Sequence, residues 1–223
     1  MRRPLLVVGA GGLARETAQA VLDLEASGGP WRLLGHLDDD PAKQGSLIDG
    51  VPVVGTVDGL ADHPDAAVVV ATGRPSDFDS RRRLVVRLDL PADRYATVVH
   101  PGAHLARSVV LGVGCVVLAG VVATAAMQLG EHVAVMPTTV LTHDDRVGAF
   151  TTIAAGVLVA GGVTIGAGAY LGAGCRIREG LVIGAGALVG MGAVVTTDVP
   201  AGQTWWGTPA RRGNCGNGRT KPS

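Results

Sequence analysis

The chain has 223 residues, enough for one large or two small domains. Hydrophobic residues make up 47% and charged residues 17%, and glycine is abundant without a strict Gly-X-Y period, which excludes a disordered chain and collagen. Nineteen basic and nineteen acidic side chains give a formal net charge of zero, so no net field favours nucleic acid or an anionic membrane as a partner.

The first hundred residues alternate between strand and helix patterns. Buried-strand patterns occur at residues 4–8, 31–37, 51–54, 66–71 and 95–99, and helical spacing of apolar residues occurs at 15–26 and 76–88. This alternation is typical of a small parallel α/β unit. We therefore expect a Rossmann-like domain over residues 1–100.

A glycine-rich turn follows the first expected strand. Residues 9–14 read Gly-Ala-Gly-Gly-Leu-Ala and fit the pattern G-x-G-x-x-A between a strand and a helix. Glycine lets the backbone approach a phosphate at a helix N-terminus, and Asp38 and Asp39 after the second strand can accept hydrogen bonds from a ribose or a base. NAD is the usual ligand of such a motif, but the chain leaves no room for the substrate domain of a dehydrogenase. A glycine turn without a ligand is the alternative.

The rest of the chain has a six-residue hydrophobic period. From Leu105 to Val195, sixteen consecutive positions spaced six residues apart each carry an aliphatic side chain. A small or β-branched residue usually stands four positions later, and a glycine often follows the aliphatic residue directly, where we expect it to ease a turn. This period fits neither a helix nor a simple strand, but it fits a triangular coil of eighteen residues. It predicts a parallel β-helix whose coils stack at about 4.8 Å, with a valine- and glycine-rich sandwich as the alternative.

Two stretches, residues 109–127 and 153–175, carry no charge and are long enough to cross a bilayer. Their glycines and their six-residue period oppose a helix, so we expect no membrane span. The apolar run before the glycine turn is too short for a signal peptide. Cys115, Cys175 and Cys215 are widely spaced and form neither a disulfide framework nor a CxxC metal site, so we expect a cytoplasmic protein.

A small nucleotide-binding domain followed by hexapeptide repeats resembles a family of bacterial sugar acetyltransferases, which includes the UDP-4-amino-sugar N-acetyltransferases and the sialic acid O-acetyltransferases. The resemblance covers about residues 4–211 and leaves a tail at 212–223. It implies a left-handed β-helix over residues 101–211 that binds acetyl-CoA, and a homotrimer with active sites between neighbouring β-helices. It also implies that the front domain holds a nucleotide-linked sugar in place of NAD. The positions matched to that role are Gly9, Gly11, Gly12, Leu13, Asp38, Asp39 and Gly73.

The family's catalytic signature is a histidine followed by an acid within the repeat, and this chain has His143 followed by Asp144. The resemblance implies that His143 is the general base and that Asp144 holds its ring; an unperturbed imidazole titrates near 6.5, which suits this role. Gly161 lies eighteen residues after His143, one coil further on. Its amide would sit about 5 Å away along the axis, suitable for an N–H aimed at a thioester carbonyl. A corner histidine with an Asx turn is the alternative.

The resemblance also implies contacts with acetyl-CoA. The segment 207–211, Gly-Thr-Pro-Ala-Arg, is similar to the family's G-x-P-A-[KR] segment near the CoA adenine, and Arg211 and Arg212 would suit a CoA phosphate. The residues expected to contact acetyl-CoA are Thr152, Gly161, Ala173, Met191, Pro209, Ala210 and Arg211. The chain departs from the family pattern at three places: Thr152 and Leu13 stand where the family often has histidine, and Met136 where it commonly has asparagine.

These residues predict an acetyl-CoA-dependent N-acetyltransferase that acts on a nucleotide-linked amino sugar by direct transfer. Sugar O-acetylation and a non-catalytic protein that binds nucleotide sugars are the alternatives. A zinc hydratase on the same solenoid needs three converging histidines. The four candidates, His100, His104, His132 and His143, do not recur at multiples of eighteen, so we expect no metal.

Overall fold

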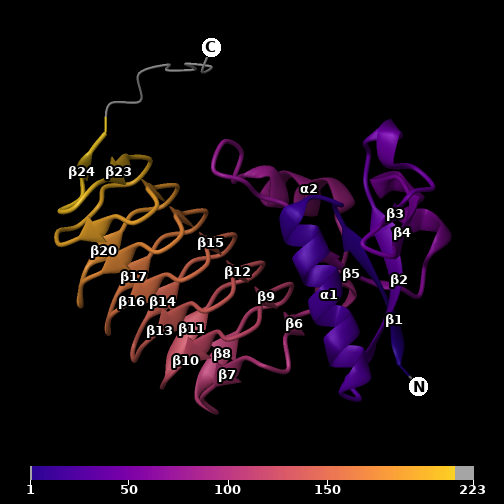
Figure 1. Ribbon diagram of the computed structural model, residues 1–223, viewed down its shortest axis with the longest axis horizontal. Coiled ribbons are helices and arrows are strands. Elements are labelled where there is room, and N and C mark those ends of the chain that lie inside the picture. The colour runs from indigo at the N-terminus through magenta and orange to yellow at the C-terminus, as the bar shows by residue number, and fades with distance from the viewer. Residues whose placement is uncertain (1, 214–223) are drawn as a thin grey trace.

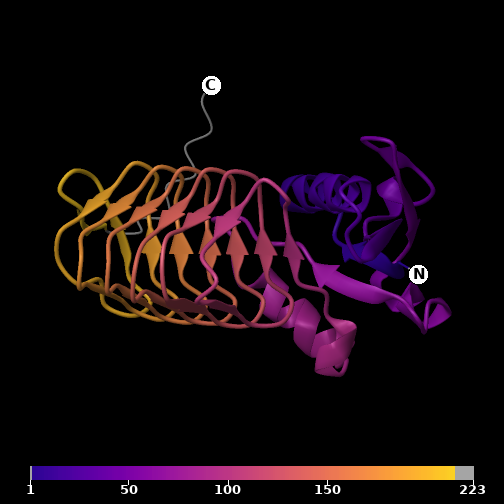
Figure 2. The same ribbon diagram turned by 90° about the horizontal axis from the view of Figure 1, so that it is seen from below.

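The computed structural model describes residues 2–213, which form an α/β unit at one end of a long β-helix (Figures 1 and 2). The last ten residues of the predicted tail, 214–223, lie outside the described residues. The first tail residue, Arg212, belongs instead to a strand that pairs with the end of the β-helix.

The front unit is a five-stranded sheet with the strand order β3-β4-β2-β1-β5. Adjacent side chains of β1 point to opposite faces, so Leu5 and Val7 pack in the cluster that contains α1, whereas Leu6 and Val8 pack on the side of α2. All neighbours are parallel except β3, which forms a hairpin with β4. The elements are β1 (Arg3–Val8), α1 (Gly12–Ala26), β2 (Trp31–Leu37), η1 (Pro41–Lys43), β3 (Leu47–Ile48), β4 (Val51–Gly55), η2 (Val57–Asp62), β5 (Ala67–Val70), α2 (Ser80–Leu88) and η3 (Ala92–Arg94).

Two elements of the front unit differ from the sequence prediction. The second helix begins at Ser80 instead of residue 76, because residues 76–79 form turns. The predicted strand 95–99 is divided: Tyr95 makes one isolated bridge to Val68, while Val98–Val99 (β6) pairs with the β-helix strand β9 (Val116–Val117). The apolar pattern shows that this stretch is extended, but it does not identify the partner strand.

Beyond β6 the chain winds into a prism with three faces, and up to β22 (Val194–Val195) the strands of each face pair in parallel at a spacing of eighteen residues. The first face holds β6 (Val98–Val99), β9 (Val116–Val117), β12 (Ala134–Val135), β15 (Thr152–Ile153), β18 (Tyr170–Leu171), β21 (Leu188–Val189), β23 (Thr204–Trp206) and β24 (Arg211–Arg212). At the end of this face, β23 pairs in parallel with β21 at a spacing of sixteen residues, and β24 is antiparallel to β23. The second face holds β7 (His104–Leu105), β10 (Val122–Ala123), β13 (Val140–Leu141), β16 (Leu158–Val159), β19 (Arg176–Ile177) and β22 (Val194–Val195). The third face holds β8 (Val109–Leu111), β11 (Met127–Leu129), β14 (Arg146–Val147), β17 (Thr164–Ile165) and β20 (Val182–Ile183).

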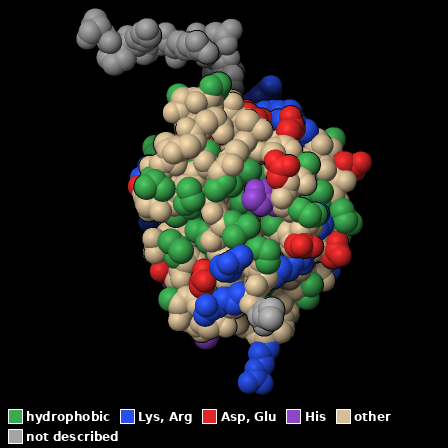
Figure 3. All heavy atoms as spheres, turned by 90° about the vertical axis from the view of Figure 1, so that its right-hand side faces the viewer, with side chains coloured by type: hydrophobic (Ala, Val, Ile, Leu, Met, Phe, Trp, Pro, Cys, Tyr) green, Lys and Arg blue, Asp and Glu red, His purple; other side chains and the backbone are tan. Residues whose placement is uncertain are grey.

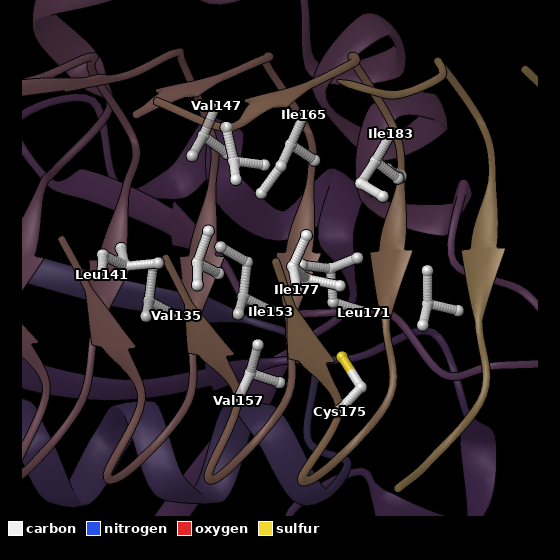
Figure 4. Close-up of a cluster of buried hydrophobic side chains, with 14 of the residues drawn as sticks. Val135, Leu141, Val147, Ile153, Val157, Ile165, Leu171, Cys175, Ile177 and Ile183 are labelled. Carbon is white, nitrogen blue, oxygen red and sulfur yellow. The ribbon is translucent and has the colours of Figure 1, made fainter. Parts of the chain in front are cut away.

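The predicted hexad register is confirmed, and the chain forms a left-handed β-helix. One residue of each short strand points inward, and side chains such as Leu141, Ile153 and Ile165 fill the same narrow interior (Figure 4). From Val117 to Val195, every aliphatic hexad position is less than 5% exposed. The core is therefore continuous along the solenoid axis, as the stacking of identical coils requires.

The glycine that directly follows an aliphatic hexad residue was predicted to ease a turn, but the structure gives it another role. A Cβ on Gly148 would lie 2.8 Å from the carbonyl carbon of Gly166, and closer still to Ala167, so this position is glycine because neighbouring coils approach each other. The left-handed backbone of the corner occurs three residues after the aliphatic position, as at Gly168 with φ +66°. In one stretch this corner position holds the non-glycine residues His132, Thr138, Asp144 and Phe150, all with positive φ.

The front unit packs against the first face of the β-helix, where α1 shares a buried cluster with Val116 and Ala134. Arg81 of α2 provides the main polar connection and is only 1% exposed. Its guanidinium donates to the carbonyl oxygens of Thr72 in the front unit and of His132, Phe150 and Thr151 in the β-helix, and to the hydroxyl of Thr152. Burial lowers the Arg81 pKa to about 10, so the side chain remains charged at neutral pH.

The end of the molecule formed by the front unit carries acidic, basic and apolar side chains side by side, without a field of one sign (Figure 3). Among the described residues, no helix is long and apolar enough to cross a membrane.

Candidate functional site

His143 lies on the corner between the second and third faces, between β13 and β14. Its Nδ1 is 2.9 Å from Oδ2 of Asp144, and the two side chains are 66% and 75% exposed. Asp144 has φ +63°, a left-handed conformation that aspartate tolerates better than most residues. The corner thus presents an imidazole to solvent with one ring nitrogen held by a carboxylate, which leaves Nε2 free to accept a proton.

Gly161 lies directly beside this ring, as the eighteen-residue spacing predicts. A Cβ at Gly161 would lie 2.9 Å from His143 Nδ1, and closer still to Cε1 and Nε2. The two corners are joined by a hydrogen bond of 2.8 Å from Gly162 N to the His143 carbonyl. Within residues 2–213 the N–H of Gly161 itself donates no hydrogen bond. An N–H donor therefore stands next to the imidazole.

A second hollow lies in the front unit, at the carboxyl ends of the parallel strands. It has a volume of about 390 Å³, and its lining includes Gly9, Gly11, Gly12, Leu13, Asp38 and Gly73, six of the seven positions predicted to hold the nucleotide sugar. Gly9 has φ +106°, and a Cβ there would lie 2.9 Å from the side chain of Thr72, so the loop requires glycine. The first N–H groups of α1 border this hollow and favour an anion such as a phosphate.

The two acids after β2 have different environments. Asp38 lines the hollow, where Oδ2 accepts from Ala10 N at 2.7 Å and pairs with Lys43 Nζ at 3.1 Å. Asp39, the seventh predicted position, does not line it: its carboxylate accepts from Val57 N and pairs with Arg87 of α2. The dipeptide Asp38-Asp39 offers both acids equally in the sequence, but only Asp38 is in place to contact a ligand in this hollow.

Part of the lining was not predicted from the sequence. Lys43 and Arg74 add positive charge, and Asp77 and Ser80 complete the rim near the start of α2. These residues follow no recognised motif, and only the folded loops bring them beside the glycine turn. Lys43 and Arg74 make the hollow suitable for a diphosphate.

The residues expected to contact acetyl-CoA are spread over the β-helix. Ala173 and Met191 lie one coil apart on the corner between the first and second faces, and Met191 is 77% exposed. Arg211 is exposed in β24, near the end of the solenoid, and Pro209 precedes Ala210 in the turn before this strand. The structure therefore leaves Ala173, Met191, Pro209 and Arg211 accessible for a ligand along the outside of the prism.

Two of the expected acetyl-CoA contacts have enclosed side chains. Thr152 is 1% exposed, and its hydroxyl accepts a hydrogen bond from Arg81 at 2.8 Å, so its side chain is not accessible to a ligand on the surface. Ala210 is also 1% exposed and packs in the β-helix core, and its N–H donates to the Val194 carbonyl. The sequence prediction did not anticipate either enclosure, because both depend on contacts between distant segments.

The front hollow and His143 do not meet within one chain. The front unit packs against the first face, whereas His143 lies on the corner that is opposite this face in a triangular cross-section. The front hollow is lined only by residues 9–80 within the described part of the chain. Among the described residues, no group of three His, Cys, Asp or Glu side chains is placed to hold a metal ion.

Two protein-family models match the chain. Residues 4–88 match the PglD N-terminal domain, and residues 146–179 and 162–197 match the bacterial transferase hexapeptide model. No curated protein sequence matches the chain.

Solved structures match along almost the whole chain. The acetyltransferase domain of PglB from Neisseria gonorrhoeae FA1090, solved with acetyl coenzyme A, has 30% identity, a TM-score of 0.84, and coverage of 95% of this chain and 100% of that one. PerB from Caulobacter crescentus, solved with CoA and GDP-perosamine, has 32% identity, a TM-score of 0.81, and coverage of 95% and 97%. WeeI from Acinetobacter baumannii AYE has 28% identity, a TM-score of 0.80, and coverage of 93% and 98%.

Proposed function

Because this chain belongs to the hexapeptide-repeat sugar acetyltransferases, we propose that it transfers the acetyl group of acetyl-CoA to the amino group of a nucleotide-linked amino sugar. The observation that carries this proposal is the placement of the His143–Asp144 pair beside the amide of Gly161. The perosamine N-acetyltransferase from Caulobacter crescentus, at 31% identity, is described with CoA and GDP-perosamine, which is a substrate of this class. Acetyl-CoA is a cytoplasmic metabolite, so the proposed place of action is the cytoplasm.

In the proposed reaction, the sugar amine attacks the thioester carbonyl carbon and forms a C–N bond. His143 Nε2 accepts the proton that the nitrogen loses, and Asp144 at Nδ1 stabilises the imidazolium. The N–H of Gly161 donates to the oxyanion of the tetrahedral intermediate. The C–S bond then breaks, the CoA sulfur receives the proton from His143, and the products are the N-acetyl sugar nucleotide and CoA.

The front hollow is proposed to hold the nucleotide. A diphosphate would lie against the N-terminus of α1 and the glycine turn, and Lys43 and Arg74 would neutralise its charge. The sugar amine would then project from the hollow towards a β-helix corner. Since His143 of the same chain lies across the prism from the front unit, this geometry favours a site completed by a second copy of the chain, as in a homotrimer.

The catalytic role of His143 is tested by His143→Asn, with His104→Asn, an exposed histidine on the second face, as the matched control. Acceptors carrying an amino or a hydroxyl group at the same sugar position are compared with acetyl-CoA. We expect transfer to the amine only, with kcat lower by about 10²- to 10⁴-fold in His143→Asn and unchanged in the control. Full activity of His143→Asn would refute the mechanism, and preferred transfer to a hydroxyl would refute the acceptor class.

The shared site is tested by mixing two inactive variants. Gly12→Glu places a negative side chain at the phosphate position, where a Cβ meets no atom within 4 Å, so the fold tolerates it. Oligomers that contain both Gly12→Glu and His143→Asn chains should regain part of the activity, because some sites combine an intact hollow with an intact histidine. Mixed oligomers as inactive as each parent would refute a site between chains.

A further inference from the structure

One ionisable side chain in the β-helix core has no part in the proposed reaction. Asp145 is completely buried on the corner that carries His143. The equivalent positions one coil earlier and one and two coils later are Met127, Val163 and Leu181, which all belong to the hydrophobic core. The coil therefore does not need a carboxylate here, and a buried charge lowers stability unless its hydrogen bonds compensate.

The two oxygens of Asp145 accept hydrogen bonds from two different coils. Oδ2 accepts from Thr142 N at 3.1 Å, and Oδ1 accepts from Val163 N at 2.9 Å. Within residues 2–213 these N–H groups are its hydrogen-bond partners, and no lysine or arginine forms an ion pair with it. Burial raises the pKa of this carboxyl to about 6, which shows that the charged form is costly at this position.

The two N–H groups belong to the backbone on either side of the proposed reaction centre. Thr142 immediately precedes His143, and Val163 immediately follows Gly161 and Gly162. The bond from Gly162 N to the His143 carbonyl joins the same two corners at a second point. A third bond, from Arg146 N to the Val163 carbonyl at 2.9 Å, also joins the two coils. The imidazole and the Gly161 amide are therefore held in register by backbone bonds and by the carboxylate of Asp145, which is the connection made by a side chain.

We infer that Asp145 is a positioning residue that locks the corner carrying His143 to the corner carrying Gly161, and so sets the distance between the proton acceptor and the oxyanion donor. This inference rests on the proposed function. Because the Asp145 side chain is completely buried and both of its oxygens are bonded to backbone N–H groups, its loss should change the geometry of the transition state but not the binding of either substrate. Small misplacements of reacting groups reduce rates by as much as about 10²-fold.

The test variant is Asp145→Asn, which keeps the shape of the side chain. Its amide has one oxygen to accept a hydrogen bond, and its NH₂ group faces the second backbone N–H. One of the two hydrogen bonds that the Asp145 carboxylate accepts is therefore lost. The control is Asp198→Asn. Asp198 lies on the third face near the end of the β-helix, next to Val199, which pairs with Ile183, and its Oδ1 accepts from Val182 N at 2.8 Å.

For Asp145→Asn we expect kcat to fall about 10- to 100-fold, with KM for acetyl-CoA and for the sugar nucleotide within a factor of two of wild type. Amide hydrogen exchange should become faster at residues 142–144 and 161–163. Asp198→Asn should change exchange near residue 182 and leave kcat unchanged. An unchanged kcat in folded Asp145→Asn, or a loss equal to that of Asp198→Asn, would overturn the inference. A wild-type protein inactive on every acceptor would refute the proposed function instead, and the exchange data would still decide whether Asp145 joins the two corners.

Discussion

The substitution Gly161→Ala tests the position of the His143 ring, and with it the proposed catalytic role, most directly. The added Cβ would lie 2.9 Å from His143 Nδ1, and closer to Cε1 and Nε2, which is inside any permitted contact. His143 is 66% exposed, so its ring can rotate into solvent and relieve the clash without unfolding the coil. A ring displaced by about 1 Å or more predicts a loss in kcat of about 10²-fold, equivalent to about 3 kcal/mol of transition-state stabilisation.

The assay is steady-state acetyl transfer, combined with thermal unfolding to confirm that the variant is folded. Gly180→Ala is the matched control, because Gly180 lies one coil further on the same corner, with φ +70° and no atom within 4 Å of an added Cβ. The control carries a backbone strain of about 1 kcal/mol without touching His143, so its stability should fall while kcat stays at the wild-type value. Wild-type kcat in Gly161→Ala would refute the placement of the imidazole over this glycine, and equal losses in both variants would attribute the effect to the backbone.

Three further predictions concern stability and the contact between the two units. Arg81→Met should destabilise the protein by about 3 kcal/mol in urea unfolding and raise KM for the sugar nucleotide, because buried carbonyls including Thr72 O lose their hydrogen-bond donor. A wild-type free energy of unfolding together with a wild-type KM would contradict the role of Arg81 as the connection between the two units. Burial, with a smaller contribution from the Arg81 charge, lowers the His132 pKa to about 4. The unfolded state therefore binds the proton more readily than the folded state. The contribution of neutral His132 to stability is complete above pH 6.5 and decreases by up to about 3 kcal/mol as the pH falls towards 4. His132→Phe should remove this part of the dependence when unfolding is compared at pH 7 and pH 4.5, and an unchanged slope would show that another group is responsible. Gly166→Ala should lower the free energy of unfolding more than Gly186→Ala. The Cβ at residue 166 would meet the backbone of the next coil, whereas the Cβ at residue 186 would meet no atom within 4 Å, although the backbone there has φ +63°. The reverse order would show that backbone conformation, and not coil spacing, selects these glycines.

The sequence alone determined the β-helix, its register and the coil that carries His143. This was possible because each coil packs only against its neighbours, so the inward side chains must recur with the period of the coil. The relation between His143 and Gly161 follows from the same period, since eighteen residues return the chain to one corner. The glycine turn likewise predicted the position of the front hollow, because the strand, turn and helix that form one side of it are contiguous in the chain.

Only the tertiary structure decided how the front unit sits on the solenoid and which polar groups face a ligand. Arg81 has no recognisable motif, and its partners His132 and Phe150 lie more than fifty residues further along the chain. For the same reason the sequence did not separate Asp38 from Asp39, because Arg87 and Val57 withdraw Asp39 only after α2 and η2 have packed. Nor did it predict that Asp145 would bridge two coils, since a hydrophobic period shows which side chains point inward but not which backbone N–H groups they meet. Periodic local contacts can be predicted from a sequence, whereas contacts between units depend on the surface that the folded units present to each other.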